Sequence, residues 1–131
     1  MIFGIGTDIL EISRIDKILK KYNQTFVSRI FGSNEIKIIE KKSKNMSLFL
    51  GKRFAAKEAT AKALGTGINQ GVNWKNIEII NFDSGKPKII LHGQANEKLK
   101  RLLPKDMKPK ISITITDEKG LAQSLVIIEA I

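Results

Sequence analysis

Three residues of this sequence have side chains suited to metal or phosphate chemistry: Asp8, Glu58 and Lys62. Glu58 and Lys62 are four residues apart in an alanine-rich segment typical of a helix, so their side chains share one helix face. An isolated pair of this kind is usually a surface ion pair worth about 0.3 kcal/mol. The small residues around it indicate close packing instead of a free surface: Ala55, Ala56, Ala59, Ala61 and Ala63. A carboxylate and an ammonium on one face can hold a divalent cation and a phosphate together.

Asp8 supplies a second carboxylate near the start of the chain. Residues 2–10 alternate like a strand, and Gly4, Gly6 and Asp8 fall on the same side of it. Two glycines beside an acid leave space for another element to approach the backbone. Mg²⁺ usually takes one or two carboxylates plus substrate phosphates, so Asp8 and Glu58 suit Mg²⁺ if the strand lies against the helix. The alternative for Asp8 is a strand-end acid that binds local N–H groups.

A glycine-containing turn, Gly65-Thr66-Gly67, follows the helix. Exposed backbone N–H groups and a hydroxyl in such a turn can cradle phosphate oxygens. The pattern is weak by itself, because it also serves as an ordinary helix stop.

Hydrophobic periodicity predicts the elements that must position these residues. We expect a strand over 2–10, a basic helix with Ser13 as its N-cap, a second helix after residue 35, a helix over 46–64, a hairpin of 77–80 with 88–91, a helix over 94–103, and strands at 111–116 and 125–128. This order predicts one compact α+β domain over residues 1–131, with helices packed on a mostly antiparallel sheet. The last strand is apolar on both faces, so a further surface has to cover it.

Composition excludes several classes of protein. The chain has 131 residues, of which 42% are hydrophobic and 27% charged, as in ordinary globular domains. It has no cysteine, which excludes disulfides and cysteine-ligated metals, and its single histidine makes a multi-histidine site implausible. No apolar run approaches the roughly 20 residues of a membrane span, and the N-terminus lacks the basic segment of a signal peptide. We therefore expect a cytoplasmic protein that binds no membrane.

The net charge of +10 is concentrated in residues 14–53, which carry eleven Lys and Arg against three acidic residues. Such a stretch attracts an acidic partner, which can be a nucleic acid or an acidic protein, or it is simply a solvated surface. A nucleic-acid-binding module explains the charge but gives no role to Asp8, Glu58 and Lys62. Aromatic residues make up only 6% of the chain, too few for a base-stacking platform. A purely structural interaction protein explains neither feature.

Three segments resemble the holo-acyl-carrier-protein synthases, the short-chain 4'-phosphopantetheinyl transferases. The first runs from Gly4 to Ile9 and continues through Glu11-Ile12 and Arg14-Ile15, the second covers Phe54–Ile68, and the third is Gly85-Lys86-Pro87. The resemblance spans essentially the whole chain. It departs from the family at Thr114-Ile115-Thr116-Asp117, where many members have a histidine, so it assigns no role to that strand end.

The resemblance implies transfer of 4'-phosphopantetheine from coenzyme A to a serine of apo acyl carrier protein, with adenosine 3',5'-bisphosphate as by-product, as a step in fatty acid biosynthesis. Asp8 and Glu58 would hold Mg²⁺, and Lys62 would offset phosphate charge. The serine needs a base, for which Glu58 and water on the metal are both candidates. The residues expected at the coenzyme are Arg53, Lys62, Gly65, Thr66, Gly67, Lys86 and Pro87.

The same resemblance implies protein partners. Arg14, Lys17 and Lys21 would meet the acidic carrier protein, so we expect no nucleic-acid partner. The family implies a homotrimer with sites at subunit interfaces. Arg53 and Glu58 are five residues apart on one helix and point about 140° apart, so Arg53 would reach the coenzyme of a neighbouring subunit unless it is solvated or paired locally.

Overall fold

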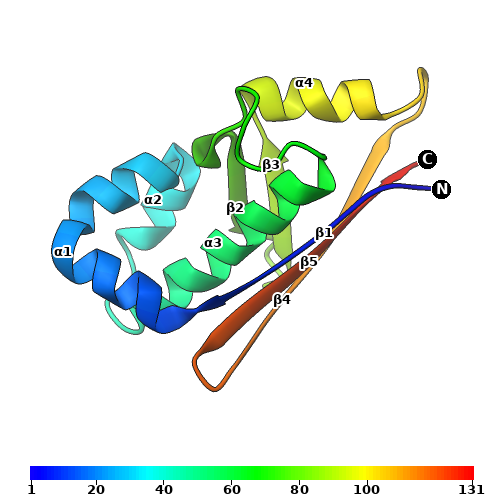
Figure 1. The fold of residues 1–131 in the computed structure, drawn as a ribbon. Coiled ribbons are helices and arrows are strands. Elements are labelled where there is room, and N and C mark those ends of the chain that lie inside the picture. The colour runs from blue at the N-terminus through cyan, green and yellow to red at the C-terminus, as the bar shows by residue number, and fades with distance from the viewer.

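The computed structural model describes all residues 1–131 and contains five helical elements and five strands (Figure 1). In chain order they are β1 (Ile2–Glu11), α1 (Ile12–Ile30), α2 (Ser33–Ile39), α3 (Met46–Ala63), the 3₁₀ helix η1 (Trp74–Asn76), β2 (Ile77–Asn81), β3 (Pro87–Leu91), α4 (Gly93–Leu102), β4 (Pro109–Glu118) and β5 (Leu121–Ala130). None of the helices combines the length and the apolar character that crossing a bilayer requires.

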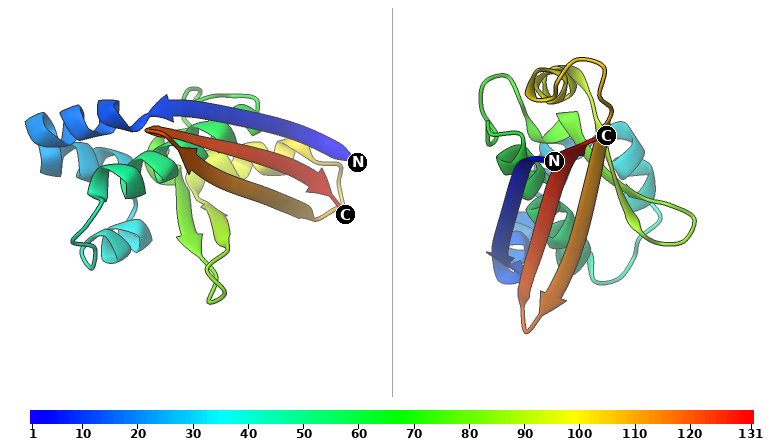
Figure 2. Two further views of the ribbon diagram at one scale, coloured as in Figure 1. Left: turned by 90° about the horizontal axis from the view of Figure 1, so that it is seen from below. Right: turned by 90° about the vertical axis from the view of Figure 1, so that its right-hand side faces the viewer.

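The strands form two antiparallel sheets, which confirms the α+β class. One sheet has the order β1-β5-β4, and the other is the β2–β3 hairpin. Helix α3 packs against both the three-stranded sheet and β2, and the helices lie on one side of the three-stranded sheet (Figure 2). The helix that carries Glu58 and Lys62 is therefore the central element of the fold.

Most element boundaries agree with the periodicity, but the last strand is longer than the predicted 125–128 (β5 is Leu121–Ala130) and α2 begins at Ser33 and not after residue 35. A further error concerns the start of α1. We expected Ser13 to cap this helix, but α1 begins at Ile12, and its N-cap Glu11 makes no side-chain cap hydrogen bond. The N–H of Ile12 donates instead to the carbonyl of Gly120 in the β4–β5 turn, at 2.9 Å. A tertiary contact thus satisfies a helix-terminal donor that the sequence assigned to a side chain.

Strand β1 lies directly against α3 because two of its residues have no side chain. A Cβ atom at Gly4 would stand 2.1 Å from the carbonyl oxygen of Ala63, and one at Gly6 would stand 2.0 Å from that of Ala59. On α3 the contact is made by small residues, and both alanines are buried. The glycine–alanine pairing confirms the prediction that another element approaches the first strand closely at Gly4 and Gly6.

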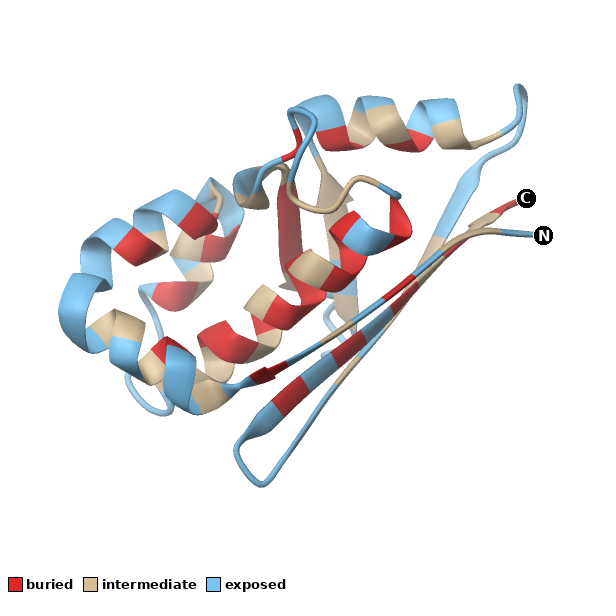
Figure 3. Cartoon of the chain, viewed as in Figure 1, coloured by how far each residue is buried: buried red, intermediate tan, exposed pale blue.

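The outer face of the three-stranded sheet has no covering layer in the single chain (Figure 3). Its apolar residues include Ile5, Ile9 and Leu125, with exposed fractions of 62%, 57% and 36%. Ile5 pairs with Ile127, and Thr7 with Leu125, so these side chains adjoin across β1 and β5. Such a contiguous apolar strip is typical of an interface with another protein surface.

We predict that Gly6→Ala destabilises the protein by about 3 kcal/mol, because the new methyl group would overlap the α3 backbone. Gly51→Ala is the matched control, since its Cβ would meet side-chain atoms only at 3.6 Å. Alanine at this position inside α3 should be neutral or stabilising by up to about 1 kcal/mol. Urea unfolding of both variants measures this, and equal stability of the two would contradict the close contact.

Candidate active site

Asp8 on β1 and Glu58 on α3 line one small pocket of about 210 Å³. Arg14, in the first turns of α1, lines it from a third element, and Phe54 lies one helical turn before Glu58. The remaining lining residues are Ile9, Leu10, Ile15 and Ile18. The structure thus brings together the two carboxylates that the sequence predicted to act on one metal.

Each carboxylate is held through one oxygen. Lys62 Nζ lies 3.1 Å from Asp8 Oδ1 and donates a second bond to the carbonyl of Thr7 at 3.0 Å. Glu58 Oε1 accepts a hydrogen bond from the indole Nε1 of Trp74 at 3.0 Å. Glu58 and Lys62 form no ion pair with each other, although their spacing allows one. Lys62 therefore connects α3 to β1 instead of pairing along its own helix.

The donor set suits a Mg²⁺ ion with incomplete protein coordination. Asp8 Oδ2 and Glu58 Oε2 accept no hydrogen bond from the protein. No group of three or more His, Cys, Asp or Glu residues is placed to hold a metal ion. Mg²⁺ is commonly bound by one or two carboxylates, with water and substrate phosphate completing its shell, so two free carboxylate oxygens at one pocket fit this ion.

The Gly65–Gly67 turn ends α3 and uses its backbone donors locally. The N–H of Gly65 donates to Lys62, and those of Thr66 and Gly67 both donate to the carbonyl of Ala61. The Thr66 hydroxyl donates to the carbonyl of Gly67 at 2.7 Å. The expectation of free N–H groups for phosphate oxygens is therefore wrong: these donors cap the helix. Both glycines have positive φ, and no atom lies within 4 Å of the point where a Cβ would stand, so a ligand can still approach the backbone.

Arg53 lies in a different pocket from Glu58. Its guanidinium stacks over the Phe49 ring at 3.8 Å and donates to Asn81 Oδ1 at 2.7 Å, while its buried Nε has no partner. Burial lowers the pKa of Arg53. The pocket, of about 440 Å³, is also lined by four lysines: Lys41, Lys42, Lys44 and Lys52. These lysines were not predicted as a site, and their clustering within twelve residues of the chain is the signal that could have found them.

Lys86 and Pro87 line a third pocket, of about 630 Å³, to which β3, α4 and β4 contribute. Asn81, the partner of Arg53, pairs with Pro87 at the end of the β2–β3 hairpin and donates to the carbonyl of Gly85 at 2.8 Å. The Lys86 side chain is exposed. Apart from the Gly65–Gly67 turn, the predicted site residues thus lie in three places: Asp8, Glu58 and Lys62 around the first pocket, Arg53 in the second, and Lys86 and Pro87 in the third.

The basic residues of α1 and the strand end of β4 also have defined places. Arg14, Lys17 and Lys21 are exposed on α1, and Arg14 adjoins the carboxylate pocket. Asp117 forms an ion pair with Lys52 at 3.1 Å. The acid at the position where the family often has histidine is therefore neutralised by a lysine of the second pocket.

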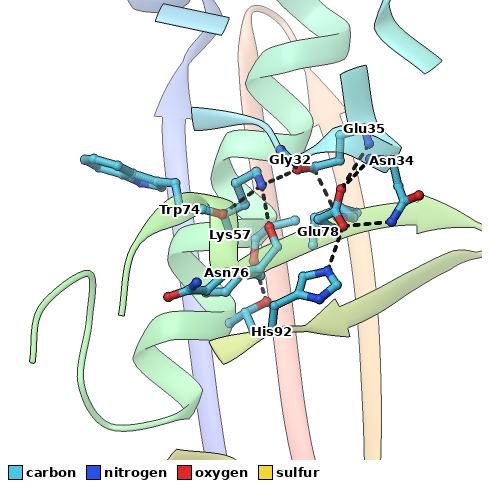
Figure 4. Close-up of polar contacts among 12 residues, drawn as sticks. Gly32, Asn34, Glu35, Lys57, Trp74, Asn76, Glu78 and His92 are labelled. Carbon is cyan, nitrogen blue, oxygen red and sulfur yellow. Dashed lines mark hydrogen bonds and ion pairs between the residues drawn. The ribbon is translucent and has the colours of Figure 1, made fainter. Parts of the chain in front are cut away.

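A buried polar cluster connects α3 to β2 and α2 (Figure 4). Lys57 and Glu35 are fully buried and lie 2.5 Å apart, and Lys57 also donates to the carbonyls of Trp74, at 3.0 Å, and Ile77. Burial lowers the pKa of Lys57 and raises that of Glu35, while the attraction between them opposes both shifts. The sequence feature that could have predicted this buried pair is Lys57 itself, a lysine among the alanines of α3.

Glu78 extends the cluster toward the surface. It accepts hydrogen bonds from the backbone N–H groups of Asn34 and Glu35 and from the Asn34 amide, and lies 2.7 Å from His92 Nε2. Burial alone would raise the pKa of Glu78, but these hydrogen bonds outweigh it and lower the pKa. The carboxylate is therefore structural, and it ties the start of α2 to β2.

The chain is similar in sequence to known proteins over almost its whole length. Residues 4–116 match the sequence profile of the 4'-phosphopantetheinyl transferase superfamily. The holo-acyl-carrier-protein synthases of Methylorubrum populi and Rhizobium meliloti are 44% and 47% identical over 131 residues, covering all of this chain and 96% and 94% of theirs.

Solved structures agree with the sequence matches. The Neisseria meningitidis synthase superposes with a TM-score of 0.86 at 36% identity, covering 98% of this chain and 99% of that one. The Helicobacter pylori synthase in complex with coenzyme A gives a TM-score of 0.78 at 30% identity, covering 95% and 99%.

Proposed function

The chain belongs to the 4'-phosphopantetheinyl transferase superfamily, and we propose that it transfers 4'-phosphopantetheine from coenzyme A to a serine of apo acyl carrier protein. The observation that carries this proposal is the shared pocket of Asp8 and Glu58, with Lys62 holding Asp8. The complex of a relative with coenzyme A supports the donor substrate. A place in fatty acid biosynthesis and the cytoplasmic location stay predictions.

The reaction exchanges one P–O bond for another. The serine oxygen forms a bond to the phosphorus on the pantetheine side of the pyrophosphate, and the bond to the bridging oxygen breaks. Adenosine 3',5'-bisphosphate leaves with that oxygen, and the serine proton passes to a base. Positioning and charge neutralisation dominate such a transfer.

Asp8 and Glu58 would hold Mg²⁺ through their free oxygens. When bound, the ion would neutralise pyrophosphate charge. Lys62, whose side chain is 51% exposed, can release Asp8 and bind a phosphate oxygen in its place. Glu58 Oε2 is the one oxygen of that carboxylate without a protein donor, so if it binds the cation, water on the metal is the remaining candidate for the serine base.

The second pocket supports a site shared between subunits. Lys41, Lys42, Lys44 and Lys52 form a basic pocket separate from the carboxylate pocket, which suits one coenzyme that spans two chains. Arg53 is buried beside them and paired locally with Asn81, the alternative that its sequence position left open, so its part in a shared site stays a prediction. The uncovered apolar face of β1 and β5 supplies a self-association surface. We therefore retain a homotrimer with sites at its interfaces as part of the proposal.

The assay of the function is direct. The protein, coenzyme A, Mg²⁺ and an apo carrier protein are mixed, and the carrier is weighed by mass spectrometry. Addition of one 4'-phosphopantetheine, absent when the acceptor serine is alanine, supports the transferase. An unmodified carrier combined with tight binding of nucleic acid would favour the basic-module alternative.

Loss of either carboxylate charge should abolish most turnover. We predict that Asp8→Asn and Glu58→Gln each lower kcat by about 10² to 10³, because a charged oxygen is removed where phosphate charge must be balanced. Glu11→Gln, an exposed acid on the same strand as Asp8, is the control and should keep wild-type activity. Near-normal turnover of either site variant at limiting Mg²⁺ would argue decisively against this metal site.

Helix α1 should dock the carrier protein. We predict that Arg14→Ala or Lys21→Ala raises the KM for the carrier on the order of fivefold, with a smaller change for coenzyme A, because rim charges steer an acidic partner. Added salt should act in the same direction. Arg101→Ala, an exposed arginine on α4, should change neither constant. Indifference of the carrier KM to salt and both α1 substitutions would place the docking surface elsewhere.

A shared site predicts complementation between inactive chains. Asp8→Ala and Arg53→Ala proteins should each be inactive alone, and mixing them under conditions that exchange subunits should recover part of the activity. Light scattering should give a trimer for each. A monomeric mass, or no recovery after verified exchange, would refute the shared site and leave the transferase function in place.

A further inference from the structure

Trp74, the only tryptophan of the chain, is held against Glu58 by three contacts with α3. Its indole N–H donates to Glu58 Oε1 at 3.0 Å. Its ring stacks on Phe54, with centroids 6.0 Å apart and planes inclined by 28°. Its backbone carbonyl accepts from the buried Lys57 ammonium at 3.0 Å. Residues 54, 57 and 58 of one helix thus hold one aromatic residue of η1.

The backbone of η1 is fixed as well. Asn73 and Asn76, on either side, accept hydrogen bonds from each other's N–H groups at 3.2 Å. The carbonyl of Asn76 accepts from the N–H of His92 at 2.8 Å. In Figure 4 the Trp74 indole points away from the Lys57 cluster that holds its carbonyl. The backbone of Trp74 is therefore held by groups outside the carboxylate pocket, while its ring stacks on Phe54, a residue of that pocket.

The stacking fixes which oxygen of Glu58 is engaged. Phe54 and Glu58 are one helical turn apart, so an indole lying over Phe54 presents its N–H to the carboxylate. A glutamate has three rotatable side-chain bonds, and a ligand that needs a fixed carboxylate must otherwise restrict them on binding. With Oε1 held by Trp74, Oε2 stays directed away from the indole and without a protein donor.

We propose that Trp74 is a positioning residue that orients Glu58 for its divalent cation. This inference rests on the proposed function, because it takes Glu58 as a metal ligand. Residues that hold a metal ligand by its second polar atom typically change metal affinity by 10- to 100-fold when they are removed. Trp74 holds Glu58 in this way, and its indole N–H is the group whose removal should weaken metal binding.

The test separates the N–H from the ring. Trp74→Phe keeps an aromatic ring for Phe54 and removes the donor. Because Trp74 is the only tryptophan, growth on benzothienylalanine replaces it alone with an isostere that has sulfur in place of the N–H. Both changes should raise the Mg²⁺ concentration for half-maximal turnover by roughly tenfold. Turnover at saturating Mg²⁺ should return to within about twofold of wild type.

A binding measurement without turnover supplies the second readout. The dissociation constant for Mn²⁺, measured by electron paramagnetic resonance with coenzyme A present, should rise by a similar factor in both altered proteins. The single indole ¹⁵N–¹H resonance of the wild type should shift as Mg²⁺ is added. In Glu58→Ala protein this resonance should not respond to Mg²⁺.

Phe26→Leu is the matched control, because it loosens the packing of the three neighbouring aromatic rings of Phe26, Phe54 and Trp74. Phe26 is buried and its ring lies 6.3 Å from that of Phe54, but it does not contact Glu58. It should lower the melting temperature and leave the Mg²⁺ and Mn²⁺ constants unchanged. The proposed role of Trp74 would be overturned if the benzothienylalanine protein kept both values within twofold of wild type: the Mg²⁺ concentration for half-maximal turnover and the Mn²⁺ dissociation constant. That result, obtained with a fully active wild type, would leave the proposed function untouched.

Discussion

The contact between β1 and α3 determines which side chains of the two elements come together. At Gly4 and Gly6 the strand backbone reaches the helix backbone without an intervening side chain, and on the helix only alanines face it. Two residues further along β1, Asp8 is thereby brought beside Lys62 and into the pocket of Glu58. Because packed interiors resist small displacements, the separation of the two carboxylates is set by backbone contact and not by flexible side chains.

A second constraint acts on the opposite side of α3. Lys57 is buried with Glu35, and its ammonium also holds the last turn before β2 through the carbonyls of Trp74 and Ile77. Burying two charges costs desolvation energy, so this pair is weak evidence for stability. Its consequence here is geometric, because it fixes η1 against the helix that carries Glu58. The two carboxylates are thus held by two contacts to one helix: Asp8 through β1, and Glu58 through Trp74 of η1.

Much of this arrangement followed from local patterns in the sequence. Alternation placed Gly4, Gly6 and Asp8 on one side of a strand, and the alanines around Glu58 indicated a tightly packed helix. The contacts of Trp74 and Lys57 could not be predicted, because they join segments 16 to 22 residues apart through the fold and have no periodic signal. The Gly65–Gly67 donors were misassigned because a phosphate-binding turn and a helix stop share one sequence pattern, and only the hydrogen bonds distinguish them.

We propose that the β1–α3 contact creates a single cation site from one carboxylate on each element. Anomalous scattering from a crystal grown with Mn²⁺ and coenzyme A tests it most directly. We expect one strong peak within coordination distance, about 2.2 Å, of oxygens from both Asp8 and Glu58, with a pyrophosphate oxygen in the same shell. A peak that contacts only one of the two carboxylates, or that lies away from their pocket, would contradict it.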